Sequence, residues 1–201
     1  MSSADDPLWP PGVSSSVSGH ASKQRCAWLA CLVSSHTKAS GKEITFLRPH
    51  SETRVEGNKQ FVAADSFKAG SRIGGRTLGA IGWTFTDHFS NVVEHDVPTG
   101  SIKSWTLLYA AGDDPLIKSL GGEGKAAVPY LSYIHQIMAK GENGPSHGDW
   151  QSNFAYVVSP LIRRLMAVNW HVSDANEWNI GAAYTPHAHL DWRFDSRVFG
   201  G

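Results

Sequence analysis

Residues 159–168 read Ser-Pro-Leu-Ile-Arg-Arg-Leu-Met-Ala-Val, and they decide how the C-terminal half of the chain is expected to fold. The apolar side chains of this run recur at the spacing of one helix face, and Pro160 suits a first helical turn. That face consists of Leu161, Ile162, Leu165, Met166 and Val168. Arg163 and Arg164 project together from the other side. The pattern therefore predicts a helix that turns two arginines toward solvent.

Helices are predicted at three other places. Asp114 caps a helix that starts at Pro115, and Gly121-Gly122 ends it, which gives a helix over residues 115–120. Val128-Pro129 begins a longer helix with an apolar stripe, which Gly141 closes. Residues 22–34 also carry one apolar face. The C-terminal half is therefore predicted to be mainly helical.

Residues 42–110 differ, because they contain short β-favouring segments separated by Gly or Pro, a pattern typical of a small sheet. These segments are residues 43–47, 60–62, 81–85 and 104–109. Residues 1–20 hold three prolines and six serines, the composition of a flexible arm. The predicted fold class is therefore α+β. One globular domain over residues 21–201 would combine a mainly helical C-terminal half with a small β-rich lobe and follow an extended N-terminal arm.

The composition indicates a globular protein without a dominant charge. Of 201 residues 41% are hydrophobic, and 18 basic side chains balance 18 acidic ones. Zero net charge gives no global attraction to nucleic acid or membrane, so contact with a polyanion must be local. Cys26 and Cys31 are the two cysteines, and their spacing does not support a disulfide framework. No leader or membrane-spanning segment is expected.

Residues 184–195, Tyr-Thr-Pro-His-Ala-His-Leu-Asp-Trp-Arg-Phe-Asp, alternate polar and apolar side chains. In an extended strand this places His187, His189 and Asp191 on one face. Zn²⁺ accepts imidazole nitrogen and carboxylate oxygen, so the pattern is compatible with a zinc-dependent hydrolase. Glu177 or Asp149 is then a candidate general base. A solvent-facing strand edge without metal explains the same pattern, and both interpretations stay open.

Several motifs follow one another between residues 159 and 195. They are Ser159-Pro-Leu-Ile-Arg-Arg-Leu165, Val168-Asn-Trp170, Ala175-Asn-Glu-Trp178, Tyr184-Thr-Pro-His-Ala188 and Leu190-Asp-Trp-Arg-Phe-Asp195. Their order resembles that in coat proteins of flexible filamentous plant viruses of the potexvirus type. The core of that family is almost entirely helical, and its chains continue past the aromatic-Asp motif.

The resemblance implies a viral coat protein that self-assembles in many copies and packages single-stranded RNA, in the virion or the host cytoplasm, without a cofactor. It implies an Arg–Asp pair beside the RNA backbone, formed by Arg163 or Arg164 with Asp191 or Asp195. Arginine forks bind phosphate bidentately, and many subunits on one RNA supply avidity without a strongly basic chain. Filament and shell geometries stay open. So does a partner-binding module that carries no chemistry.

Overall fold

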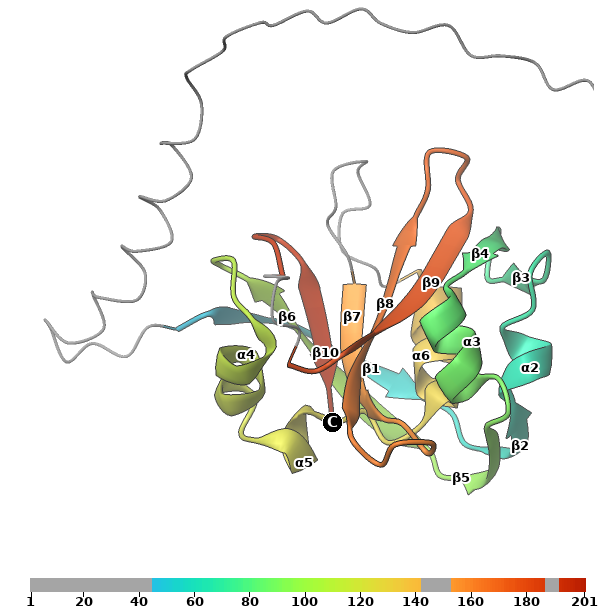
Figure 1. Cartoon of the computed structure of the whole chain (residues 1–201), viewed down its shortest axis with the longest axis horizontal. Helices are drawn as coiled ribbons and strands as arrows, with labels where there is room; N and C mark the ends of the chain where they lie inside the picture. Colours follow the sequence, from blue (N-terminus) through green and yellow to red (C-terminus); the bar gives the residue numbers. More distant parts are fainter. Residues whose placement is uncertain (1–44, 142–152, 187–191) are drawn as a thin grey trace, which may run out of the picture. The chain divides into compact units, whose positions relative to one another are not determined.

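The computed structural model describes residues 45–141, 153–186 and 192–201, and its main element is a large mixed β-sheet (Figure 1). Its eight strands lie in the order β1-β6-β10-β7-β8-β9-β4-β3. The pairs β10–β7 and β4–β9 are parallel, and the other described pairs are antiparallel. The strands are β1 (Leu47–Val55), β3 (Arg72–Ile73), β4 (Arg76–Ile81), β6 (Gly100–Leu107), β7 (Asn153–Val158), β8 (Leu165–Val172), β9 (Trp178–Tyr184) and β10 (Arg197–Gly200).

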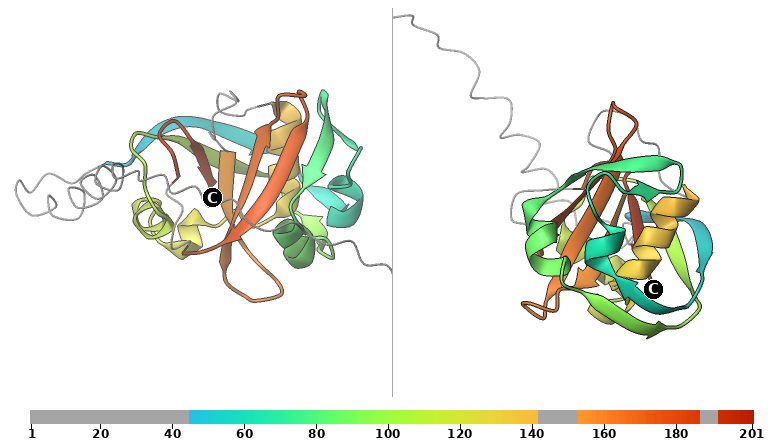
Figure 2. Two further views of the ribbon diagram at one scale, coloured as in Figure 1. Left: turned by 45° about the horizontal axis from the view of Figure 1, so that its top comes forward. Right: turned by 90° about the vertical axis from the view of Figure 1, so that its right-hand side faces the viewer.

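Helices cover both faces of the sheet, and a separate two-stranded ribbon joins β2 (Asn58–Val62) to β5 (Val93–Val97). The described helices are α2 (Ala63–Ser66), α3 (Trp83–Phe89), α4 (Asp113–Ser119), α5 (Glu123–Ala126) and α6 (Leu131–Lys140). Residues of α2, α3 and α6 belong to one buried cluster, and residues of α4 and α5 belong to another. Figure 2 shows these two groups of helices in further views. The middle of the sheet is therefore a buried layer between them.

The strands β7 and β8 show this layering in their side-chain alternation. Ala155 and Val157 of β7 face the cluster that contains α6, whereas Phe154 and Tyr156 face the cluster that contains α4. In β8, Met166 and Val168 face the first cluster and Leu165 and Ala167 face the second. Successive strand residues point to opposite faces, so a strand covered on both sides is a continuous apolar run.

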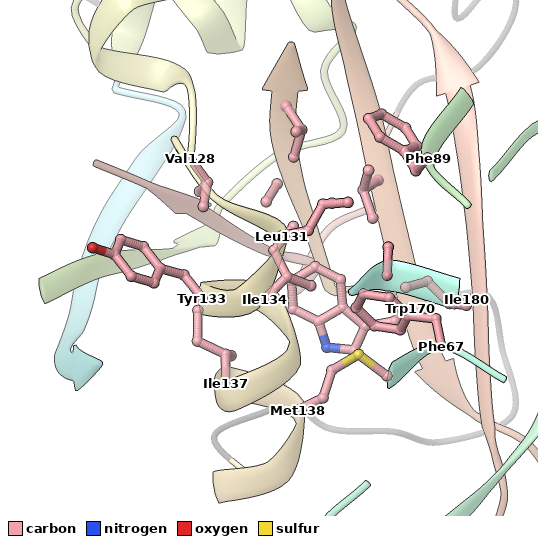
Figure 3. Close-up of a cluster of buried hydrophobic side chains, with 14 of the residues drawn as sticks. Phe67, Phe89, Val128, Leu131, Tyr133, Ile134, Ile137, Met138, Trp170 and Ile180 are labelled. Atoms are coloured by element: carbon pink, nitrogen blue, oxygen red, sulfur yellow. The ribbon is translucent and has the colours of Figure 1, made fainter. Parts of the chain in front are cut away.

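The larger cluster is centred on α6 and Trp170 of β8 (Figure 3). Burial of each large apolar side chain contributes roughly 1.5–3 kcal/mol. The α6 side chains that pack here are Leu131, Ile134, Ile137 and Met138. The start of α6 is capped from β5, because the Glu94 carboxylate accepts hydrogen bonds from the backbone N–H groups of Leu131 (2.6 Å) and Ser132 (3.1 Å). A carboxylate at this end also complements the helix dipole.

The prediction of a mainly helical C-terminal half is wrong, because the C-terminal part of the described chain is dominated by strands. Residues 159–164 form the turn between β7 and β8, and Leu165–Val172 is strand β8. The apolar run from Leu165 to Val168 fits one helix face, but it also fits a strand that is buried on both sides. Ala167 decides between the helix and the strand. In a helix it would lie on the solvent-facing side together with Arg163, four residues earlier, but in this structure it is fully buried.

Other predictions have mixed outcomes. The helix over residues 115–120 corresponds to α4, but α4 begins at Asp113 after Gly112, so the prediction that Asp114 caps it is wrong. The helix that Gly141 closes corresponds to α6, where Gly141 adopts the left-handed conformation with φ 69°. Residues 104–109 largely form β6, but residues 81–85 run into α3 instead of a strand. The N-terminal arm and the predicted helix 22–34 lie outside the described residues. Within the described ranges, no helix is long and apolar enough to cross a membrane.

Candidate nucleic-acid interface

The two arginines lie in a tight turn that connects β7 to β8. The turn is closed by backbone hydrogen bonds from the Ser159 N–H to the Arg164 carbonyl (2.9 Å) and from the Arg163 N–H to the Ser159 carbonyl (2.8 Å). The Ser159 hydroxyl oxygen accepts from the N–H groups of Leu161 (3.2 Å) and Ile162 (3.4 Å). Serine hydroxyls favour turns because they offer the backbone such local partners. Arg163 completes the turn with φ 55°, in the left-handed region.

This turn presents charge and apolar surface together. Arg163 and Arg164 are both exposed, and neither side chain has an ion pair or hydrogen bond within the described ranges. Beside them Val158 is 52% exposed and Leu161 is 66% exposed. Large apolar side chains held in water next to unpaired cations are typical of a contact surface. Two guanidinium groups are thus available to an anion from outside the chain.

Tyr184 joins this surface from the end of β9. It is opposite Met166 in the β8–β9 register and is 48% exposed. His88 of α3 contacts Tyr184 in two ways. The His88 Nε2 atom lies 2.9 Å from the Tyr184 hydroxyl, and the two rings meet edge-on at 87°. We call Leu161, Arg163, Arg164 and Tyr184 the turn surface.

His88 connects the turn to the aromatic ring. Its other ring nitrogen, Nδ1, lies 3.0 Å from the Ser159 hydroxyl, so one imidazole bridges the turn and the end of β9. Helix α3 is held against β9 independently, because the Gly82 N–H donates to the Ile180 carbonyl (2.8 Å). Gly82 has no room for a side chain without a shift, since an added Cβ would lie 3.3 Å from the Gly181 Cα. The Ser159–His88–Tyr184 hydrogen-bond chain therefore fixes the position of the Tyr184 ring.

No protein-family model, curated protein or solved structure matches the chain.

Asp195, another predicted nucleic-acid residue, does not join the turn surface. Asp195 donates its backbone N–H to Leu107, near the start of β10. Because β10 and β7 are parallel with Arg197 beside Asn153, Asp195 lies at the end of the sheet where β7 begins, whereas the turn follows the end of β7. A strand of six residues separates these ends by about 20 Å. No described contact pairs Asp195 with either arginine, and Asp191 lies outside the described residues.

Most residues of the predicted zinc site lie outside the part of the chain that the structure describes. His187, His189, Asp191 and Asp149 all belong to ranges that the structure does not describe. Glu177 is described, and it lies in the β8–β9 hairpin, where its backbone N–H donates to the Ser173 hydroxyl (3.3 Å). Within residues 45–141, 153–186 and 192–201, no three metal-ligating side chains come together.

A second buried polar group lies on the opposite face of the sheet. The Asp113 carboxylate, 2% exposed, accepts hydrogen bonds from the Tyr156 hydroxyl (2.9 Å) and the Trp192 indole N–H (2.8 Å). Burial, followed by the nearby Asp113 charge, raises the pKa of Tyr156 far above its ordinary value. The Trp192 ring also stacks on Phe154 at 3.9 Å. This group anchors the segment before β10 to the sheet, and its hydrogen-bond donors stay protonated at physiological pH.

The sequence predicts Arg163 and Arg164 as RNA-binding residues, but it carries no signal for His88, which links the turn to Tyr184. His88 contacts Ser159 across 71 residues and Tyr184 across 96 residues, and no local pattern signals such contacts. The predicted helix that begins at Pro160 is absent, and Ser159 is instead the hydrogen-bonding centre of a turn.

Proposed function

We propose that the protein binds single-stranded RNA at the turn surface. The observation that carries this proposal is the exposure of Arg163 and Arg164, without side-chain partners among the described residues, in a turn that His88 connects to the exposed ring of Tyr184. Guanidinium forks suit phosphate oxygens, and an exposed aromatic ring stacks on unpaired bases. A duplex hides its base faces, so the aromatic part of the surface favours single strands.

The expected affinity of one site is modest. Two arginines neutralise at most about two phosphates, which corresponds to a slope of about −1.4 in log K against log salt for a single strand. Zero net charge adds no long-range attraction. Useful affinity therefore requires several copies on one strand, where avidity raises the apparent affinity by about 10²–10⁴.

The test measures fluorescence anisotropy of a labelled oligouridylate with the wild-type protein and with Arg163→Ala/Arg164→Ala. We expect salt-sensitive binding by the wild type and its near loss in the double variant. The matched control is Arg48→Ala/Lys103→Ala, which removes two exposed positive charges from β1 and β6, away from the turn. Equal loss in both double variants would indicate non-specific charge attraction and contradict a site at the turn. Stronger binding of duplex RNA would contradict the role of the aromatic ring.

Self-assembly into a coat is the second candidate function, and exposed aromatic rings on another part of the molecule favour it. Tyr109 is 59% exposed and Phe194 is 57% exposed, on segments that the Ala111–Trp192 backbone bridge holds together. Aromatic residues are enriched where subunits meet. Size-exclusion chromatography with absorbance at 260 and 280 nm, followed by electron microscopy, tests assembly. Ordered particles that contain nucleic acid would support a coat, and a nucleic-acid-free monomer at all concentrations would contradict it.

A further inference from the structure

We infer that the Tyr184 hydroxyl is a hydrogen-bond donor directed at the ligand, so that the turn surface selects ligands that present anionic oxygen, such as an RNA phosphate. Because it concerns the same surface, this selectivity presupposes the RNA binding proposed above. The inference comes from the number of protons and lone pairs along the Ser159–His88–Tyr184 chain.

Ser159 determines which atoms donate and which accept along the Ser159–His88–Tyr184 hydrogen-bond chain. A serine hydroxyl has one proton and two acceptor lone pairs. The Ser159 oxygen already accepts from the N–H groups of Leu161 and Ile162, which occupies both lone pairs. Its remaining contact is with the His88 Nδ1 atom at 3.0 Å, and the side chain is fully buried. The Ser159 proton is therefore donated to Nδ1, and Nδ1 must be the acceptor.

The His88 ring then donates a hydrogen bond to Tyr184. In a neutral imidazole one ring nitrogen accepts and the other carries the proton. With Nδ1 as acceptor, the proton is on Nε2, which faces the Tyr184 oxygen at 2.9 Å. His88 is 6% exposed, and Phe89 and Tyr184 flank its ring. The Nε2–H group therefore donates to the Tyr184 oxygen.

Tyr184 ends the chain at the surface. Its oxygen accepts from His88, so its own O–H proton is not used in that bond. No other hydrogen bond to this hydroxyl is present among the described residues, and the side chain is half exposed. The proton is therefore offered to solvent or to a ligand. It complements the two guanidinium groups, which can only donate hydrogen bonds. The turn surface thus combines three donor groups with an aromatic face.

The direction of the chain is tested without RNA. In ¹⁵N-labelled protein near neutral pH, long-range ¹H–¹⁵N spectra distinguish the two tautomers of His88, and we expect the proton on Nε2. The Ser159→Ala variant removes the proton that fixes Nδ1 as acceptor, so it is expected to lose the strict tautomer preference. If the wild-type spectrum places the proton on Nδ1, the hydrogen bonds run in the opposite direction. Tyr184 then donates to His88, its oxygen can only accept from a ligand, and the inference is overturned.

The selectivity is tested by binding. Tyr184→Phe keeps the ring and removes the donor, so we expect binding of oligouridylate to weaken about tenfold, as for loss of a charge-assisted hydrogen bond. Binding of a peptide nucleic acid of the same sequence, which lacks phosphates, should be weak and unchanged by this substitution. Tyr130→Phe is the matched control, because it also removes one phenol hydroxyl and lies at the start of α6, outside the turn surface. Unchanged RNA affinity in Tyr184→Phe would overturn the donor role.

The experiments distinguish a failure of RNA binding from a failure of the Tyr184 donor role. If the wild-type protein binds no RNA, the proposed function and the ligand assignment both fall, whereas the His88 tautomer still decides the direction of the chain. If RNA binds through the arginines but Tyr184→Phe has no effect, the function stands and the donor role is wrong.

Discussion

Replacing Ser159 by Ala should destabilise the protein far more than its position in a turn suggests. The hydroxyl serves three groups: the N–H groups of Leu161 and Ile162 and the buried Nδ1 of His88. Each buried polar group left without a partner costs about 1–3 kcal/mol. The two N–H bonds are long and the turn is partly exposed, so His88 should account for most of the loss. We expect the free energy of unfolding to fall by about 2–4 kcal/mol.

The assay is urea unfolding followed by tryptophan fluorescence, with calorimetry as a second measurement. At about 2–4 °C per kcal/mol for a chain of this size, the melting temperature should fall by roughly 5–15 °C. Ser119→Ala is the control, because the Ser119 hydroxyl donates to the Pro115 carbonyl at an exposed site, where the change should stay within about 0.5 kcal/mol. A Ser159→Ala variant as stable as this control would refute the assignment of Ser159 as the hydrogen-bonding centre of the turn.

The remaining predictions concern the sheet, pH, the second buried group and salt. Ala167→Lys should prevent folding, judged by circular dichroism and solubility, because it places a charge in a fully buried strand, whereas a solvent-facing helix position would tolerate it. Burial lowers the pKa of His135, so its neutral form is favoured in the folded state and its contribution to stability is complete above the ordinary value of 6.5. That contribution is lost as the pH falls through the depressed folded-state pKa. His135→Phe, which keeps the ring beside Phe61 and Phe67, should therefore reduce the loss of stability between about pH 7 and 5. A loss as steep as in the wild type would assign the effect to other groups, among them His171, whose pKa burial also lowers. Asp113→Ala should cost about 2–4 kcal/mol in urea unfolding, because two buried donors lose their acceptor, and Asp113→Asn, which keeps an oxygen, should cost clearly less. In RNA titrations Arg163→Ala/Arg164→Ala should flatten the salt slope by about 1.4, and an unchanged slope would place the phosphate contacts elsewhere.

The parts of the fold that the sequence predicted well are those fixed by local signals. The end of α4 follows from Gly121-Gly122, and α6 follows from its apolar stripe and Gly141. The start of α4 does not follow in this way, because the helix begins at Asp113 after Gly112 and Asp114 is not its cap. These signals act within a few residues, so they can be recognised in the sequence without knowing the tertiary contacts.

The β8 strand could not be assigned in the same way. Its apolar run is continuous because helices cover both faces of the sheet, and periodicity does not separate such a strand from a buried helix. The candidate site shows the same limit. Exposed arginines are visible in a sequence, but the imidazole that positions Tyr184 comes from a helix 96 residues away. The motif Ser159–Leu165 is one of those that carry the resemblance to filamentous coat proteins, and in this structure that segment is a turn and the start of a strand, not a helix.

The place of β10 has a consequence for how the chain folds during synthesis. Residues 197–200 are inserted between β6 and β7, so the centre of the sheet cannot close until they have left the ribosome. Until then β6 and β7 each present an unpaired edge, and unpaired edges recruit strands from other chains. Long-range pairing of this kind also slows folding. Expression at low temperature or with chaperones should therefore improve the soluble yield, and cutting the chain before Arg197 should send the product into aggregates.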